Sequence, residues 1–151
     1  MASDDAGLAS RVQRWADGKA TLKDVRGYSD EELYSIARTA YFFYYQGRLN
    51  EARTLFQGLY AVNPTDAYFA KALGVVEMAA GNPQGASAAY DVAIKIAPDD
   101  PAAYVGRAEV RISQGQRTQA IDDLRRAGQL STEDDTLKAK ISALLGALLK
   151  K

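Results

Sequence analysis

The chain of 151 residues contains neither cysteine nor histidine. The absence of cysteine excludes disulfides, thiolate metal sites and cysteine nucleophiles, and it suits a reducing compartment. The absence of histidine removes the side chain that most often binds metals and transfers protons near neutral pH. The sequence also lacks a phosphate-binding glycine loop with a lysine, and it lacks a nucleophile elbow. We therefore expect no metal, no cofactor and no enzymatic activity.

Neither the charge nor the hydrophobicity of the chain has the form that marks nucleic-acid-binding or membrane proteins. The 19 basic and 19 acidic residues cancel, so no excess charge attracts nucleic acid. No apolar run approaches the ~18 residues of a membrane span, and the acidic start MASDDAGLASRV lacks the pattern of a signal peptide. We expect a cytoplasmic protein with no nucleic-acid partner and no stable membrane insertion.

The sequence does contain an internal repeat of fixed period. Glycine suits the left-handed position that ends a helix, alanine allows two helices to approach closely, and proline cannot continue a helix. The pattern resembles the tetratricopeptide repeat, a helix-turn-helix unit of about 34 residues. Three sets of residues recur at this spacing: Gly47, Gly81 and Gly115; Ala52, Ala86 and Ala120; Pro64 and Pro98.

This resemblance predicts an all-α tetratricopeptide-repeat superhelix with three helix-turn-helix repeats over residues 31–134. The individual repeats are expected at residues 33–66, 67–100 and 101–134. Residues 1–30 are expected to form an N-terminal helical arm, in which the segment KATLKDVRGYS is irregular. Capping patterns indicate three helix starts: Ser29 with Glu32, Asn82 before Pro83, and Asp100 before Pro101.

The last segment, residues 135–151, is predicted to be an amphipathic helix that caps the third repeat. Terminal repeats need such a cap, and the two final lysines suit a helix C-terminus. Two alternatives are a helix that lies on a membrane surface and a helix that folds back into the groove of the repeats. Its apolar face is expected to contain Leu137, Ile141, Leu144, Leu145, Leu148 and Leu149.

Five consecutive aromatic residues, Tyr41 to Tyr45, stand in the first helix of repeat one. A helix turns about 100° per residue, so these rings cannot all face one core. We expect Ile36, Ala40 and Phe43 to face the partner helix, and Phe42 to point toward the position of a preceding repeat. An apolar stripe of the N-terminal arm is expected to cover Phe42: Leu8, Val12 and Trp15.

The other rings are expected on the concave wall that the first helices of successive repeats line. An apolar surface rich in tyrosine is typical of a binding site, because rings provide contact area at small entropic cost. An extended peptide or a single helix would fit this groove, although such rings can also be core. The predicted groove residues are Tyr34, Ala37, Tyr41, Tyr44, Tyr45, Tyr68, Lys71, Val75, Met78, Val105, Glu109 and Ile112.

The third repeat departs from the usual pattern at two arginines. Arg107 and Arg111 stand where leucine and an aromatic residue are usual. Because these arginines alternate with Glu109, Asp122 and Asp123, we expect a solvated face and not a basic patch for nucleic acid.

The run YSDEELYSIARTAYFFYYQGRLNEARTLFQGLYAVNPTDAYFAKALGVVEMAAGN resembles the class II chaperones of bacterial type III secretion, which hold hydrophobic translocator subunits before export. The resemblance extends from about Tyr28 to Leu130. It implies that the groove accepts a short extended segment of a translocator containing proline and leucine. It also implies a homodimer through the N-terminal arm, with Leu8, Val12 and Trp15 as the candidate contacts.

Two other protein-binding roles remain open on the sequence alone. A general scaffold or adaptor would use the same groove for a partner that is not a membrane-active secreted protein. A chaperone of the secretion needle subunit would bind an amphipathic helix and would require a small co-chaperone. Both share the repeat skeleton, which identifies the fold and not the ligand.

Overall fold

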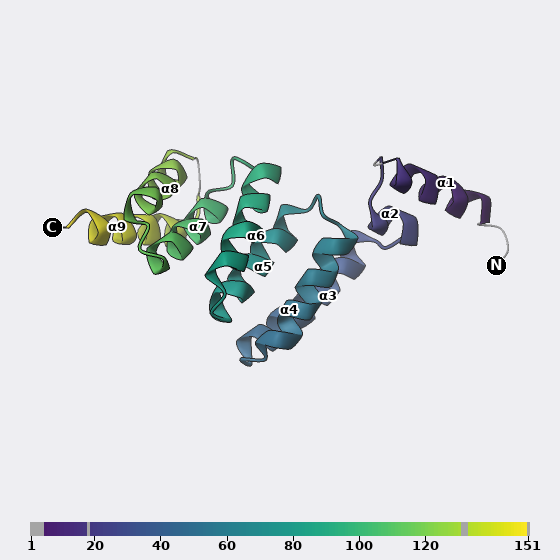
Figure 1. Ribbon diagram of the computed structural model, residues 1–151, viewed down its shortest axis with the longest axis horizontal. Helices are drawn as coiled ribbons and strands as arrows, with labels where there is room; N and C mark the ends of the chain where they lie inside the picture. Colours follow the sequence, from purple (N-terminus) through teal and green to yellow (C-terminus); the bar gives the residue numbers. More distant parts are fainter. Residues whose placement is uncertain (1–4, 18, 131–132, 151) are drawn as a thin grey trace. The chain divides into compact units, whose positions relative to one another are not determined.

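The computed structural model describes residues 5–17, 19–130 and 133–150, and all regular structure in these ranges is helical (Figure 1). The all-α prediction is therefore confirmed. The chain forms two compact units, Met1–Phe69 and Ala70–Lys151, and their boundary falls within one helix. The helices are α1 Asp5–Ala16, α2 Leu22–Arg26, α3 Asp30–Tyr45, α4 Leu49–Val62, α5 Ala67–Ala79, α6 Pro83–Ile96, α7 Pro101–Ser113, α8 Arg117–Gln129 and α9 Asp135–Leu149.

The repeated glycines end the first helix of each pair, as the sequence predicts. Gly47, Gly81 and Gly115 have φ angles of 78°, 78° and 73°. Glycine adopts this left-handed conformation readily because it has no Cβ atom to clash with the backbone. The backbone can therefore reverse direction within a few residues and begin an antiparallel second helix.

The predicted helix starts are also present, and each is stabilised by a side-chain oxygen that accepts a backbone N–H. The bonds run from Glu32 to Ser29 at 3.1 Å, from Gly85 to Asn82 at 3.1 Å and from Ala102 to Asp100 at 3.0 Å. Each satisfies an N–H group that has no partner within its own helix.

In the first unit, α3 packs along α4 (Figure 1). The buried face of α3 is not the one that the sequence predicted, because Ile36 is exposed and Phe43 is only half-buried. Ala40 is fully buried, as expected. The guanidinium of Arg48 covers the Phe43 ring at 4.4 Å. The interface consists of Leu33, Ala37 and Ala40 from α3 and Ala52, Phe56 and Leu59 from α4.

The N-terminal arm contains a second helix, α2, where the sequence was expected to be irregular. Thr21 accepts the N–H of Asp24, and the Asp24 carboxylate in turn accepts the N–H of Thr21. This capping box, with Gly27 in the left-handed region at its end, delimits the short helix and buries Val25. The Thr-x-x-Asp spacing was the signal that the sequence interpretation missed.

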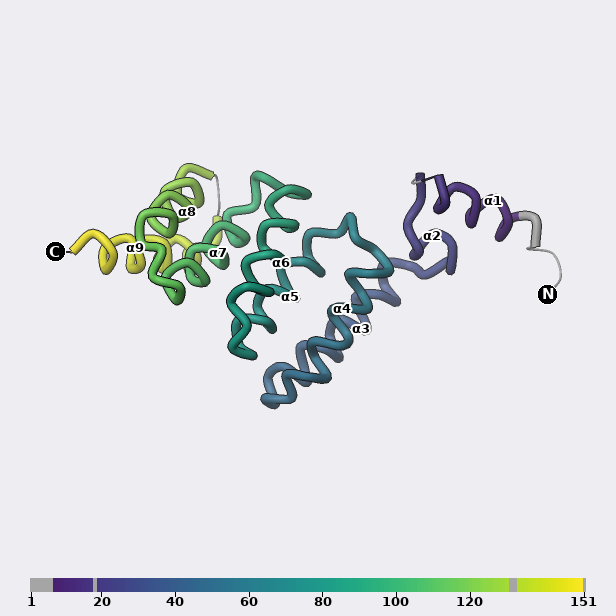
Figure 2. The backbone as a smooth tube through the Cα atoms, in the orientation of Figure 1, coloured from purple at the N-terminus to yellow at the C-terminus, as the bar shows by residue number. Residues whose placement is uncertain are grey.

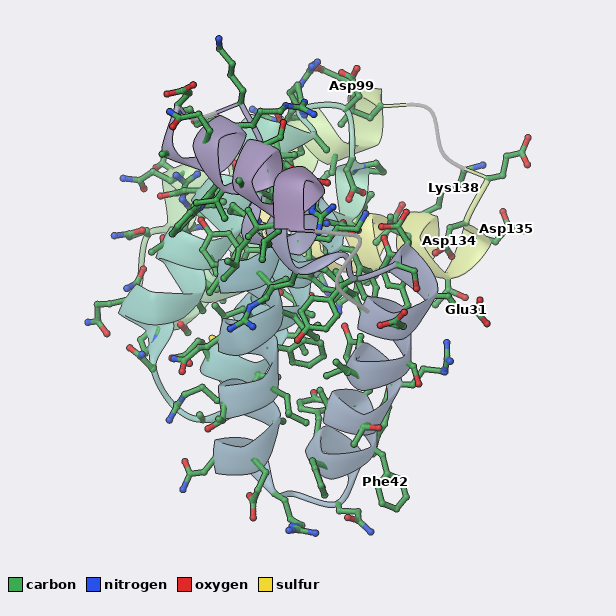
Figure 3. All side chains as sticks on the ribbon, turned by 90° about the vertical axis from the view of Figure 1, so that its right-hand side faces the viewer. Glu31, Phe42, Asp99, Asp134, Asp135 and Lys138 are labelled. Carbon is green, nitrogen blue, oxygen red and sulfur yellow. The ribbon has the colours of Figure 1, made fainter. Side chains whose placement is uncertain are left out.

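The prediction that the arm covers Phe42 is wrong. Phe42 is 59% exposed, and its ring points outward near the loop that joins α3 to α4 (Figure 3). The arm enters α3 at Asp30, so about 18 Å of helix separates that point from Phe42. Trp15 instead borders a pocket of about 370 Å³ with Ala61 and Pro64, at the end of α4.

In the second unit, α9 packs against the last repeat. Figure 2 shows its backbone beside those of α7 and α8. The Nζ of Lys140 lies 2.5 Å from a carboxylate oxygen of Glu109, and Arg117 donates to the carbonyl of Leu148 at 2.8 Å. Ile141 is buried, whereas Leu149 is exposed and does not belong to the packed face. The other predicted residues of that face pack against the core: Leu137, Leu144, Leu145 and Leu148.

The two arginines of the third repeat lie in a partly buried ion-pair network and not on a solvated face. Arg107 donates to both carboxylate oxygens of Asp123, at 3.0 and 2.8 Å, and Arg111 donates to one of them at 2.7 Å. The Asp123 side chain is only 5% exposed. Arg107 also pairs with Asp91 of α6 at 3.0 Å. The two arginines are not solvated because the pairing of α7 with α8 brings them against the carboxylate of Asp123.

Candidate peptide-binding site

Five tyrosines of the predicted groove form one continuous surface in the first unit, which we call the tyrosine wall: Tyr34, Tyr41, Tyr44 and Tyr45 of α3 and Tyr68 of α5. The centroids of Tyr34 and Tyr68 are 5.5 Å apart, and those of Tyr41 and Tyr68 are 6.3 Å apart. Tyr45 stacks on Tyr41 at 6.2 Å and meets Tyr44 edge-on at 5.2 Å. The rings contact one another in the offset and edge-to-face arrangements that their charge distribution favours.

The wall rests on the core but leaves ring surface open. Tyr41 meets the fully buried ring of Phe56 at 4.9 Å, and this contact fixes the middle of the wall. Tyr45 is 80% exposed. Tyr34, Tyr41 and Tyr44 are half-buried. An exposed apolar surface held in place by buried neighbours is well suited to binding, because little side-chain entropy is lost when a ligand arrives.

Asp66 holds two members of the wall. The hydroxyl of Tyr34 donates to Oδ2 of Asp66 at 2.5 Å, and the backbone N–H of Tyr68 donates to Oδ1 at 2.9 Å. The bond to Asp66, together with burial, raises the pKa of Tyr34 to about 12. Burial also raises the pKa of Tyr68, while a hydrogen bond from Tyr41 acts in the opposite direction.

Ala37 does not belong to the wall, contrary to the prediction. It is 1% exposed and packs in the α3–α4 interface. The sequence placed Ala37 on the concave side because it stands one turn from Tyr34 and Tyr41. The buried stripe of α3 passes through this position instead, so a ligand cannot contact its methyl group.

In the second unit, the predicted groove residues of α5 are half-buried. Val75 and Met78 pack against the core around Tyr90 and Val110. Lys71 forms an ion pair with Oδ2 of Asp100 at 2.5 Å. This surface is therefore mainly apolar, and its lysine charge is compensated by a neighbouring carboxylate.

The predicted groove residues of α7 are engaged by the end of the chain. Val105 is 2% exposed and belongs to the core, so its assignment to a ligand surface is wrong. Glu109 pairs with Lys140 of α9, and Ile112 packs against the cluster that contains Ile141. The reason is that α7 contacts α6 and α8 and is also reached by α9, which leaves less of its surface open.

The candidate dimer contacts Leu8, Val12 and Trp15 are all exposed on α1. Sequence reasoning did not single out Asp66, and it identified Asp100 only as a helix cap; they bind the predicted site residues Tyr34 and Lys71. Their recurrence at the last position of two successive repeats, each directly before a first helix, was a signal that could have identified them. Within the described ranges, we find no group of three or more acidic, histidine or cysteine side chains that could hold a metal.

No helix in the part of the chain that the structure describes is long and apolar enough to cross a membrane. Comparison with known proteins finds the tetratricopeptide repeat over residues 38–101 and again over residues 77–144. The chaperone protein SicA of Salmonella typhimurium is 30% identical over 131 residues, which cover 85% of this chain and 78% of SicA.

Two solved chaperones share the fold. The type III secretion translocator chaperone SycD of Yersinia enterocolitica gives a TM-score of 0.81 at 24% identity, over 85% of this chain and 98% of SycD. SycD has also been solved as a dimer and in complex with a peptide of the translocator YopD. PcrH of Pseudomonas aeruginosa, solved with the chaperone binding region of PopD, gives 0.75 at 22% identity, over 81% of this chain and 94% of PcrH. The repeat matches and the likeness to SicA establish that the chain belongs to the family of tetratricopeptide-repeat chaperones that includes SicA.

Proposed function

We propose that this protein is a translocator chaperone that holds an extended apolar segment of a secreted translocator on its tyrosine wall before type III export. The observation that carries the proposal is the wall itself, an exposed aromatic surface anchored on Phe56. Its support from relatives is that SycD and PcrH have been solved with peptides of YopD and PopD. Masking an apolar segment keeps a translocator from aggregating or pairing prematurely.

In the second unit, the apolar surface of Val75 and Met78 and the charge of Lys71 are proposed as a further binding surface on α5. Glu109 and Ile112 are proposed as its margin, next to α9. We expect the few rings with the largest open area to supply most of the binding energy. Tyr45 is the strongest candidate, because it combines a largely exposed ring with fixed aromatic neighbours.

The proposal includes three further properties of the molecule. It acts in the cytoplasm, before the translocator is exported. It acts by binding and not by catalysis, as its chaperone relatives do. It forms a homodimer through α1, with the exposed residues Leu8, Val12 and Trp15 as contacts; the dimeric SycD structure supports the dimeric state alone.

The test is a binding titration with two fluorescent peptides, the YopD peptide held by SycD and the chaperone binding region of PopD. We expect the wild-type chain to bind at least one of them. Tyr45→Ala removes a hot-spot ring and should weaken binding by about 2 kcal/mol, which is about thirtyfold in Kd. Tyr41 is unsuitable for this purpose, because its ring also supports the core through Phe56.

Phe42→Ala is the matched control. It removes an exposed ring from the same helix, but the ring contact of Phe42 is to Phe43 and not to the wall. Affinity should therefore be unchanged. Equal losses in the two variants would contradict the assignment of the wall. Binding of neither peptide by the wild-type chain would favour a general scaffold, and binding only of an amphipathic helix would favour a needle-subunit chaperone.

A further inference from the structure

We propose that Asp66 and Asp100 are positioning residues of the peptide-binding surface, each fixing a ligand-facing side chain of one first helix to the start of the next first helix. This inference rests on the proposed function. It assigns a role in binding to two carboxylates that the ligand does not need to touch.

Asp66 uses its two carboxylate oxygens for two different tasks. It precedes α5, and Oδ1 accepts the N–H of Tyr68 in the first turn of that helix at 2.9 Å. Oδ2 accepts the hydroxyl of Tyr34, on α3, at 2.5 Å. The Tyr34 ring also contacts the rings of Tyr68 and Phe69, each at a centroid distance of 5.5 Å. One side chain thus joins α3 to α5 within the first unit.

Asp100, at the same position of the next repeat, divides its oxygens in the same way within the second unit. It is the N-cap of α7, and Oδ1 accepts the N–H of Ala102 at 3.0 Å. Oδ2 lies 2.5 Å from Nζ of Lys71, on α5. The partner is a cation here and a phenol in the first unit, but the arrangement is the same. A helix cap carries a second acceptor oxygen toward the preceding first helix.

Both tasks use an acceptor oxygen, and a carboxylate supplies two. Serine can cap a helix but offers one oxygen, and asparagine presents an NH₂ group in place of the second acceptor. An NH₂ group cannot accept the hydroxyl hydrogen of Tyr34, and it would face the ammonium of Lys71 with a donor. Ser29 and Asn82 cap α3 and α6 without this second bond to a groove residue. Asp66 and Asp100 therefore differ from Ser29 and Asn82 in using a second oxygen toward a predicted groove residue.

The expected consequence for binding is preorganisation. The bond to Asp66 holds Tyr34 against Tyr68, so the ligand does not have to order this ring. The ion pair with Asp100 keeps an uncompensated ammonium out of a mainly apolar surface. Loss of either carboxylate should therefore weaken peptide binding while the repeats remain folded.

The experiment compares Asp66→Ser with Tyr34→Phe and with the double variant, using whichever YopD or PopD peptide the wild-type chain binds. Serine keeps the cap on α5 but has no second oxygen for Tyr34. We expect each single variant to bind about tenfold more weakly, and the double variant to be no weaker than Asp66→Ser. Asp66→Asn is a second, size-matched variant. Asp99→Asn, at an exposed carboxylate, is the charge control and should bind as wild type.

A second readout does not depend on any peptide. The ionisation of Tyr34 can be followed by ¹³Cζ NMR, with Tyr34→Phe identifying its resonance. In the wild-type chain the hydroxyl should remain largely protonated at pH 11, because the bond to Asp66 raises its pKa to about 12. In Asp66→Ser it should ionise nearer the ordinary tyrosine value of about 10. This shift shows whether Asp66 holds the Tyr34 hydroxyl, and the peptide affinities show whether that bond acts in binding.

The outcomes separate the two proposals. An unchanged Tyr34 ionisation in Asp66→Ser would overturn the inference, and so would a shifted ionisation with unchanged peptide affinity. Asp100→Ser tests the second unit in the same way, and it should lower affinity while Asp99→Asn does not. If the wild-type chain binds neither peptide, the proposed function fails and the inference fails with it. That result is recognisable before any variant is made.

Discussion

Two glycines make room for the ring of Tyr90 in the second unit. Tyr90 is buried on α6 and faces Gly74 of α5 and Gly106 of α7. A Cβ atom at Gly74 would lie 2.8 Å from the ring, and a Cβ atom at Gly106 would lie 2.3 Å from it. Real Cβ atoms do not approach an aromatic carbon so closely. Glycine is therefore required at these helix-interior positions by packing and not by backbone conformation.

Gly106→Ala should lower the stability of the fold, although alanine favours a helix by about 1 kcal/mol over glycine. Overpacking costs about 1–3 kcal/mol. We expect this cost to exceed the gain in helix propensity, because the new Cβ atom would lie 2.3 Å from the Tyr90 ring. Gly146→Ala is the control, because a Cβ there meets nothing within 4 Å. It should raise the stability slightly. Urea unfolding followed by circular dichroism measures both, and a more stable Gly106→Ala would contradict the close packing of Tyr90.

At the scale of helices, the contact between α7 and α8 includes a partly buried cluster of charged side chains. Asp123 accepts bonds from Arg107 and Arg111 and is itself buried. Hydrogen bonding to Asp123 raises the pKa of Arg107, so the guanidinium stays charged at every relevant pH. A buried pair of this kind is weak evidence for net stabilisation, but removing one partner is costly because a charge is left without compensation.

Asp123→Ala is therefore expected to destabilise the fold by about 3 kcal/mol, because two guanidinium groups lose their buried partner. Asp122→Ala removes the neighbouring exposed carboxylate and should change the stability by less than about 0.5 kcal/mol. Thermal unfolding of the two variants provides the comparison. Replacing Arg107, Arg111 and Asp123 together by apolar residues should restore the stability. A triple variant as unstable as Asp123→Ala would contradict this account.

Helix ends could be predicted from the sequence, but the faces of the helices could be predicted only in part. Turn glycines and capping residues act locally, so Gly47 and Asp100 indicated their roles without any knowledge of tertiary structure. The direction of a side chain depends on which neighbours pack against its helix. Ile36 and Ala37 differ by one position, and the interpretation assigned them to the wrong sides because the packing direction of α4 is not encoded in α3 alone.

For the molecule as a whole, the tyrosine wall was predictable because a helical period brings Tyr34, Tyr41 and Tyr45 to one side. The engagement of α7 by α9 was not predictable. An amphipathic helix can pack on any apolar surface that it reaches, and the sequence left both a cap and a groove occupant open. The ion pair of Glu109 with Lys140 shows where α9 packs. Apart from the local capping box of α2, the interactions that pattern reasoning missed join segments distant in sequence.

The two ends of the chain are packed very differently. The apolar residues of α1 are exposed, and α1 packs on the short α2. α9 buries Ile141 and packs four leucines against the core around Tyr104 and Leu124. Repeat proteins depend on a terminal element that covers the last apolar face. We therefore expect α9, and not α1, to be required for the stability of the isolated chain.

A chain that lacks residues 133–151 should lose at least about 3 kcal/mol of stability, because burial of one isoleucine and of parts of several leucines is lost. It should also bind a hydrophobic dye, since the core beneath α9 becomes exposed. A chain that lacks residues 1–17 should unfold within a few degrees of the full chain, because it loses side chains that are already in contact with water. Calorimetry of the three chains at one low concentration, which limits any contribution from a dimer, makes the comparison. Equal destabilisation by the two deletions would show that α1 also covers part of the core.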